Sequence, residues 1–179
     1  MSWIDKLRDR LAHQRKYASF FDWHDKSRKE LGVVEELVRT MEARGEVEFC
    51  SPRCWSQDPP DCIGKDKTGE TVAFEVTELV SEEAVRMNQK GHQVYRDWRP
   101  VDVVNRIEEI LKDKDSKVYR GGPYSRIVAV IHTDEPVISF DEYSQVLTEH
   151  PFGPLKQVTE AFLVMRDAYI HLSLERSPQ

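Results

Sequence analysis

Residues 60–79 contain the feature that most constrains the fold, because they read as two short strands joined by a tight turn. The segment Asp66-Lys67-Thr68-Gly69-Glu70 is typical of a three-residue hairpin loop that ends on a glycine in the left-handed conformation. If residues 67–69 form the loop, Asp66 pairs with Glu70 and, counting back, Asp61 lies opposite Glu75.

This register predicts a pair of carboxylates on one face of the hairpin. Opposite residues in an antiparallel pair share a face, with Cβ atoms about 4.5–5.5 Å apart. Two carboxylates at that separation repel each other unless a cation or a proton lies between them. Mg²⁺ is often bound by one or two carboxylates, with water and phosphate completing its coordination. Asp61 and Glu75 are therefore candidate metal ligands.

The alternation along residues 71–78 places Glu75 on the less apolar face. Val72, Phe74 and Val76 point one way, whereas Ala73, Glu75 and Thr77 point the other. An alternative interpretation is a surface hairpin whose acidic residues lie on its wet side. A four-residue loop would also shift the register by one and separate the two carboxylates.

The order Pro60-Asp61, hairpin, Glu75-Val76-Thr77 resembles the PD-(D/E)xK phosphodiesterase superfamily, which has the restriction-endonuclease-like fold. Thr77 departs from the family pattern, because it stands where the family has lysine. A hydroxyl carries no charge and cannot replace an ammonium in stabilising a phosphorane. Some branches with Glu-Val-Thr supply the lysine from a nearby helix, and the resemblance makes Lys114 the first candidate and Lys117 the second. Both also suit the last turn of a helix, which favours cations on electrostatic grounds alone.

Glu30 is the remaining candidate site residue. Helical spacing places it on the apolar face of a helix predicted over residues 26–44, where a carboxylate needs a partner. In the PD-(D/E)xK fold a glutamate on the helix before the first strand commonly reaches the active site, and Glu30 matches that position. The alternative is that Glu30 completes a capping box with Ser27.

The predicted element order gives the fold class, an α/β (α+β) chain with a mixed central sheet flanked by helices. An amphipathic pattern over residues 2–20 predicts a helix that packs on the body or on a second copy of itself, which allows a homodimer. The order within residues 26–133 is similar to the α-β-β-β-α-β core of the restriction-endonuclease-like fold. The predicted elements are helices at 26–44, 81–90, 100–117 and 139–150, and strands at 46–50, 60–66, 70–79, 126–132, 161–165 and 169–174, with a polar loop at 51–60.

The 179 residues fit a single domain with a real core. We divide it into an N-terminal helix (1–24), a nuclease-like core (25–133) and a C-terminal strand extension (134–179). No apolar run approaches the roughly eighteen residues of a membrane span, and the N-terminus has no apolar signal region. These features predict a cytoplasmic protein without membrane association.

The charge distribution is uneven. The net charge of −6 does not favour a nucleic-acid binder, but residues 1–30 contain eight Lys or Arg against five Asp or Glu. This basic arm, of charge +3, predicts either phosphate contact or only a solvated helix face. Three cysteines, Cys50, Cys54 and Cys62, argue against a disulfide framework. A zinc site that they share with a histidine is a weaker interpretation than reduced cysteines in strands. His132 ends a buried strand, where a hydrogen-bonded structural histidine is a commoner interpretation than a ligand or base.

The resemblance implies a nuclease-like hydrolase, an endonuclease or exonuclease that uses Mg²⁺ or Mn²⁺ to cleave phosphodiester bonds in DNA or RNA. Asp61, Glu75 and the carbonyl of Val76 would hold the metal, Glu30 would position a second metal or a water, and Lys114 would stabilise the charge at phosphorus. One alternative is an inactive module of the same fold that binds or assembles, for example within a defence system. Another is an unrelated small α/β protein with an acidic surface hairpin.

Overall fold

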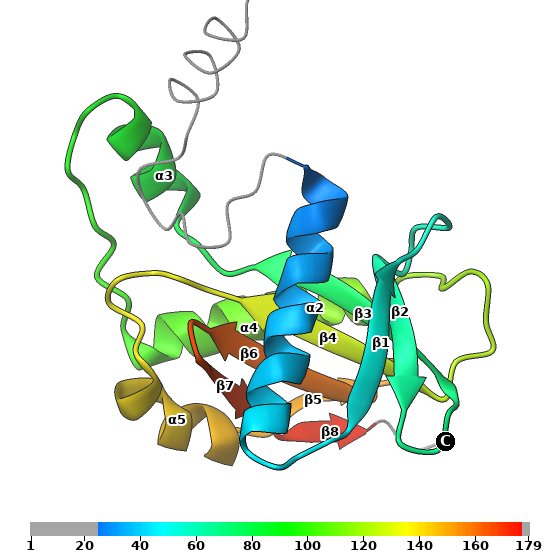
Figure 1. Cartoon of the computed structure of the whole chain (residues 1–179). Helices are drawn as coiled ribbons and strands as arrows, with labels where there is room; N and C mark the ends of the chain where they lie inside the picture. The colour runs from blue at the N-terminus through cyan, green and yellow to red at the C-terminus, as the bar shows by residue number, and fades with distance from the viewer. Residues whose placement is uncertain (1–24, 177–179) are drawn as a thin grey trace, which may run out of the picture.

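The computed structural model describes residues 25–176 (Figure 1). The helix expected at 2–20, and most of the basic arm, lie outside this range. The described helices are α2 (Lys26–Ala43), α3 (Glu82–Gln89), α4 (Pro100–Asp115) and α5 (Phe140–Glu149). The strands are β1 (Phe49–Cys54), β2 (Cys62–Asp66), β3 (Thr71–Glu78), β4 (Arg126–His132), β5 (Phe152–Leu155), β6 (Glu160–Met165), β7 (Ala168–His171) and β8 (Leu174–Arg176).

A mixed six-stranded sheet with the order β1-β2-β3-β4-β6-β7 is the centre of the fold. The first three strands are antiparallel, β3, β4 and β6 are parallel, and β7 returns antiparallel to β6. The parallel strands require crossovers, which α3–α4 and α5 supply. A separate two-stranded sheet pairs β5 with β8. The mixed α/β class expected from the sequence is confirmed.

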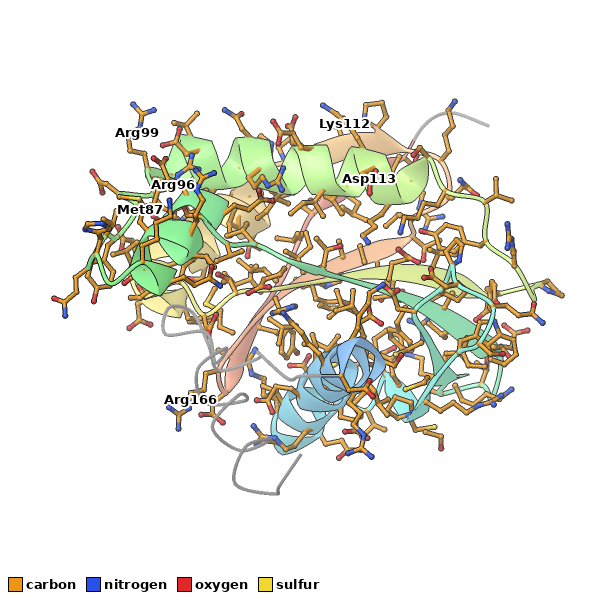
Figure 2. All side chains as sticks on the ribbon, turned by 90° about the horizontal axis from the view of Figure 1, so that it is seen from above. Met87, Arg96, Arg99, Lys112, Asp113 and Arg166 are labelled. Carbon is orange, nitrogen blue, oxygen red and sulfur yellow. The ribbon has the colours of Figure 1, made fainter. Side chains whose placement is uncertain are left out.

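Helices cover both faces of the large sheet, and Figure 2 shows α2 and α4 on opposite sides of it. On one face, Val34, Leu37 and Met41 of α2 belong to a core cluster with strand residues such as Phe74 and Phe162. On the other face, α4 and α5 pack around Ala129, Ile131 and Leu163. The central strands are therefore buried on both sides, and α3 lies outside these layers beyond the end of β3 (Figure 1).

This burial corrects the interpretation of β3 as having a wet face. Ala73 and Glu75 point away from α2 but are 0 % exposed, because β3 pairs with β4 and α4 covers that side. The alternative of a surface hairpin is therefore wrong for Glu75. Helix α4 turns one side toward the sheet and the other toward solvent. Val101 is 54 % exposed, whereas Val103 and Lys114 are buried.

Several element boundaries also differ from expectation. The first strand begins at Phe49 rather than Glu46, because a turn at Arg44 and Gly45 (φ 76°) follows α2 and pairing with β2 runs only from Phe49 to Cys54. This strand is irregular, with a register shift between Cys50 and Arg53 and a positive φ of 52° at Ser51. The predicted strand at 169–174 is divided between β7 and β8, and β5 was not expected.

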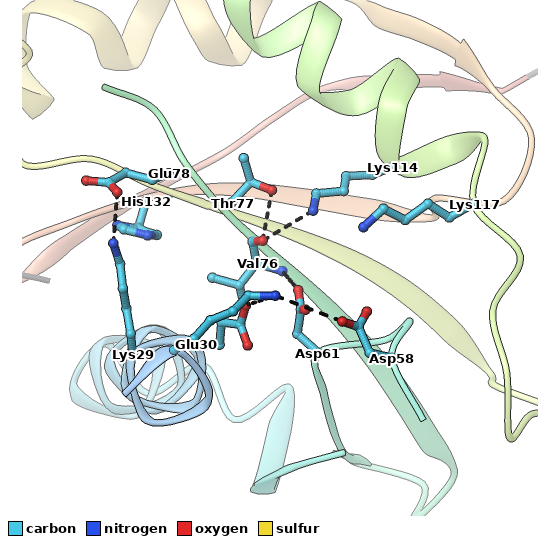
Figure 3. Close-up of a pocket in the computed structure, with 11 residues that line it drawn as sticks. Lys29, Glu30, Asp58, Asp61, Val76, Thr77, Glu78, Lys114, Lys117 and His132 are labelled. Carbon is cyan, nitrogen blue, oxygen red and sulfur yellow. Dashed lines mark hydrogen bonds and ion pairs between the residues drawn. The ribbon is translucent and has the colours of Figure 1, made fainter. Parts of the chain in front are cut away.

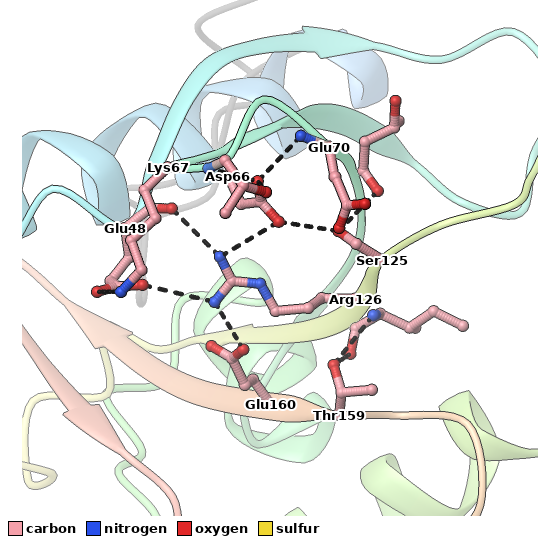
Figure 4. Close-up of polar contacts among 11 residues, drawn as sticks. Glu48, Asp66, Lys67, Glu70, Ser125, Arg126, Thr159 and Glu160 are labelled. Atoms are coloured by element: carbon pink, nitrogen blue, oxygen red, sulfur yellow. Dashed lines mark hydrogen bonds and ion pairs between the residues drawn. The ribbon is translucent and has the colours of Figure 1, made fainter.

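Arg126 fixes the turn end of the hairpin to the start of β4 (Figure 4). Its guanidinium donates to Glu160 at 2.9 Å and lies 3.8 Å from a carboxylate oxygen of Asp66. The same group stacks over the Phe49 ring, 4.7 Å from its centroid. Because β1, β2, β4 and β6 all contribute contacts here, this cluster locks the alignment of the strands that carry the candidate site.

No helix among residues 25–176 is long and apolar enough to cross a membrane.

Candidate metal centre

A pocket of about 360 Å³ opens between the start of α2, the end of α4 and the last residues of β3 (Figure 3). Its walls are rich in charged groups of both signs, which distinguishes it from an apolar ligand cavity. The lining residues are Lys26, Lys29, Glu30, Asp58, Asp61, Val76, Thr77, Glu78, Lys114, Lys117 and His132. Three of the four site residues predicted from the sequence line the pocket, and the fourth, Glu75, forms ion pairs with the lining residues Lys114 and Lys117.

The hairpin places Asp61 next to Glu75 as predicted. Gly64 pairs with Val72 and Cys62 with Phe74, so continuing this register by one step sets Asp61 opposite Glu75. The turn is closed by a hydrogen bond from the Asp66 amide to the Glu70 carbonyl, with Gly69 at φ 83°. The Val76 amide donates to Asp61 Oδ2 at 2.8 Å, which fixes the Asp61 carboxylate against β3.

A third carboxylate completes a group with metal-ligand spacing. One ligand oxygen each from Asp58, Asp61 and Glu75 lie within 4.8 Å of one another, the only such group of Asp, Glu, His or Cys among residues 25–176. Asp58 was not predicted as a ligand, although an acid three residues before Asp61 was a usable signal. The cysteines take no part in this group. Cys50, Cys54 and Cys62 are free thiols, so the structure gives no support to a zinc site that they share.

Glu75 is the most deeply buried member of the group. Its side chain is 0 % exposed, and its Oε1 atom has no hydrogen-bond partner. A buried carboxylate oxygen without a partner is expensive and calls for a cation or a proton. This atom therefore supports the fit of a divalent ion to the carboxylate group.

Two lysines neutralise the other oxygen of Glu75. Lys114 Nζ lies 3.0 Å and Lys117 Nζ 2.6 Å from Glu75 Oε2. Lys114 also donates to the Val76 carbonyl at 3.3 Å, and its carbonyl accepts a hydrogen bond from the Tyr119 hydroxyl at 2.8 Å. The structure thus brings both lysine candidates to the acidic pair, on the far side of β3 from α2.

Thr77 does not act as the missing cation. Its hydroxyl donates to the carbonyl of Val76 at 2.8 Å. The Val76 carbonyl accepts hydrogen bonds from both Thr77 and Lys114. The Lys114 ammonium group of α4 therefore lies beside the Thr77 hydroxyl of β3.

Glu30 faces the pocket from α2 and is not part of a capping box. Asp25 caps the helix by accepting from the Arg28 amide at 3.0 Å, so the capping interpretation is wrong. The Glu30 carboxylate instead lies 3.3 Å from Lys26 Nζ. Burial raises the pKa of Glu30, and the charge of Asp61 raises it further, although Lys26 opposes both effects.

The same electrostatic strain is present at Asp61. Burial raises its pKa, and the charge of Glu75 adds to this, against the hydrogen bond from the Val76 amide. The raised pKa values mean that the ionised carboxylates of Glu30 and Asp61 are disfavoured by their surroundings, a cost that a bound cation would relieve.

His132 and an ion pair form the opposite wall. His132 is 1 % exposed at the end of β4, in register with Glu78 of β3. Glu78 binds Lys29 of α2 at 2.8 Å, and both line the pocket (Figure 3). Sequence reasoning did not identify Glu78, and it counted Lys26 and Lys29 only as members of the basic arm, because nothing in a single helix or strand pattern reveals that α2 crosses the end of β3.

Comparisons with family models, with curated proteins and with solved structures found no match to this chain.

Proposed function

We propose that the protein is a divalent-metal-dependent nuclease that hydrolyses phosphodiester bonds in DNA, related to the PD-(D/E)xK superfamily with its lysine moved to a helix. One observation carries the proposal. One oxygen each of Asp61, Glu75 and Asp58 lie within 4.8 Å of one another, and Glu75 adds a buried oxygen that has no hydrogen-bond partner.

The arrangement of elements supports the same assignment. An antiparallel β1-β2-β3 unit follows α2, and β4 then adds parallel to β3 after α4. This order is similar to the α-β-β-β-α-β core of the restriction-endonuclease-like fold. The acidic residues come from β3 and the segment before β2, and the lysines from the end of α4, as the variant with Glu-Val-Thr requires.

Each side chain has a defined role in this proposal. Asp58, Asp61, Glu75 and the Val76 carbonyl would hold Mg²⁺ or Mn²⁺, which when bound supplies Lewis-acid activation of the phosphate and the attacking water. Lys114, nearly buried and fixed by Glu75, would stabilise the negative charge that develops on the phosphate oxygens. Glu30 would orient the attacking water from the α2 side of the pocket.

A cleavage assay tests the proposal. Supercoiled, linear and single-stranded DNA and an RNA are incubated with Mg²⁺ or Mn²⁺, with and without chelator. We expect DNA cleavage that Glu75→Gln and Asp61→Asn abolish, and a loss of about 100-fold in Lys114→Met. Glu70→Gln is the matched control, because Glu70 is an exposed carboxylate on the same hairpin.

The second candidate is an inactive binding or assembly module of the same fold. The observation that favours it is the neutralisation of Glu75 Oε2 by two lysines, which resembles a structural ion-pair cluster. Mn²⁺ binding that requires Glu75, without cleavage of any substrate, would favour this candidate. Absence of both binding and cleavage would favour a small α/β protein whose acidic group is only structural.

A further inference from the structure

Two lysine ammonium groups surround the single carboxylate of Glu75, so the positive charge next to it exceeds its own negative charge. Both ammonium groups lie on the same oxygen, Oε2, at 2.6 and 3.0 Å, although a single carboxylate carries one negative charge. Asp61 belongs to the same group of carboxylates and contributes a second negative charge. A divalent ion bound by Asp58, Asp61 and Glu75 would lie close to both lysines and would be repelled by each. Metal binding therefore favours departure of one lysine.

The two lysines differ in how firmly they are held. Lys114 belongs to α4, has a side chain 9 % exposed and donates also to the Val76 carbonyl. Lys117 lies beyond the end of α4, has a side chain 30 % exposed, and its hydrogen bond to a protein acceptor goes to Glu75. Lys117 can thus swing toward the open pocket, whereas Lys114 cannot move without breaking a second contact.

Charge explains why Lys117 stays on Glu75 in the metal-free protein. Lysine is a cation at neutral pH, and the Glu75 carboxylate, 2.6 Å from Lys117 Nζ, holds it through their opposite charges. The Lys117 side chain also lines the pocket, so its charge is available to a phosphate group bound there.

We infer that Lys117 is an exchangeable cation that occupies Glu75 in the free protein and transfers to a phosphate group of the substrate when the metal ion binds. The inference rests on the proposed function. It assigns to Lys117 a role distinct from that of Lys114, and it requires the metal ion and the phosphate to favour each other's binding. Lys117 repels the metal ion while it stays on Glu75. A bound phosphate would hold Lys117 away from Glu75, and a bound metal ion would release Lys117 to the phosphate, so each ligand would favour binding of the other.

Metal titration without nucleic acid is the first test. Mn²⁺ binding is measured by calorimetry for the wild type, Lys117→Met and Lys29→Met. Lys29 is the matched control, because it lines the same pocket but pairs with Glu78. We expect Lys117→Met to bind Mn²⁺ about two- to fivefold more tightly, the range of a partly exposed ion pair, and Lys29→Met to change less. Lys114 remains on Glu75 in the variant, so the fold is preserved.

Equal tightening in both variants would mean a general loss of positive charge and would overturn the exchange. Unchanged affinity in Lys117→Met, with clear Mn²⁺ binding by the wild type, would overturn the inference alone. Absence of Mn²⁺ binding in every protein would overturn the proposed function together with it.

Coupling to phosphate is the second test. Thymidine 5′-monophosphate carries one phosphate and no diester that could be hydrolysed. We expect it to increase the Mn²⁺ affinity of the wild type by a larger factor than that of Lys117→Met. The same factor in both proteins, including no increase in either, would contradict the exchange.

Discussion

Asp66 organises the hairpin turn through a single carboxylate. Its Oδ1 accepts from the Thr68 amide and hydroxyl and from the Glu70 amide, at 2.7–3.0 Å. Its Oδ2 accepts from the Ser125 hydroxyl at 3.0 Å, which links the turn to the segment before β4. The Thr68 hydroxyl is the main reason why the pKa of Asp66 falls from 3.8 to about 2.

This shift predicts a pH-dependent contribution to stability. Because the folded pKa is depressed, ionised Asp66 stabilises the protein above pH 3.8, and the contribution is lost as the pH falls toward 2. We expect Asp66→Asn to melt at a lower temperature than the wild type at pH 7. Thermal denaturation followed by circular dichroism at several pH values checks this, and a difference that stays constant down to pH 2 would contradict it.

For individual residues, the sequence predicted which side chains form the candidate metal centre better than it predicted how deeply they are buried. A three-residue loop and strand alternation were enough to align Asp61 with Glu75, because hairpin register depends on local backbone geometry. The resemblance supplied Lys114 and Glu30. Asp58 was missed, because its approach depends on the path of an irregular loop. The burial of Glu75 was missed, because small neighbours such as Ala73 do not reveal whether a face is covered.

At the level of elements, Asp115 joins the end of α4 to the segment before β6. Its carboxylate accepts from the backbone amides of Lys156, Gln157 and Val158 at 2.7–3.0 Å. A negative charge at the end of a helix is unfavourable, so these three hydrogen bonds explain its presence there. They also hold the connection that brings β6 beside β4.

We expect Asp115→Ala to lower the free energy of unfolding by about 2 kcal/mol, because three backbone amides, two of them partly buried, lose their acceptor. Asp113→Ala is the control, since Asp113 is exposed on the same helix. Urea denaturation of both variants and the wild type measures the difference. Equal stability of the two variants would show that the amides find other acceptors.

Elements were predictable where the pattern was long and regular. Helices α2, α4 and α5 and strands β3, β4 and β6 occupy nearly the expected residues. The sheet of β5 and β8 was not foreseen, because β5 is four residues long and contains Gly153 and Pro154. Such short strands form through pairing with a distant partner and not through local preference.

For the whole molecule, a bound ion should act as a stabilising ligand, because the three carboxylates come together only in the folded chain. At Mn²⁺ concentrations about 100 times the dissociation constant, the gain is about 2.7 kcal/mol. For a chain of this size we expect the melting temperature to rise by about 5–10 °C.

Glu75→Gln should lose this rise, whereas Glu70→Gln should keep it. Thermal shift measurements with increasing Mn²⁺ compare the three proteins. A rise of the same size in Glu75→Gln would mean that the ion binds elsewhere on the folded chain.

The irregularity of β1 has a consequence for association between molecules. In the part of the chain that the structure describes, β1 forms one edge of the six-stranded sheet, where unpaired backbone groups could recruit a strand from another molecule. Ser51 has a positive φ and Pro52 has no amide hydrogen to donate, so the edge presents no continuous row of donors and acceptors. Growth of the sheet from one molecule to the next is therefore blocked at this edge by the backbone itself.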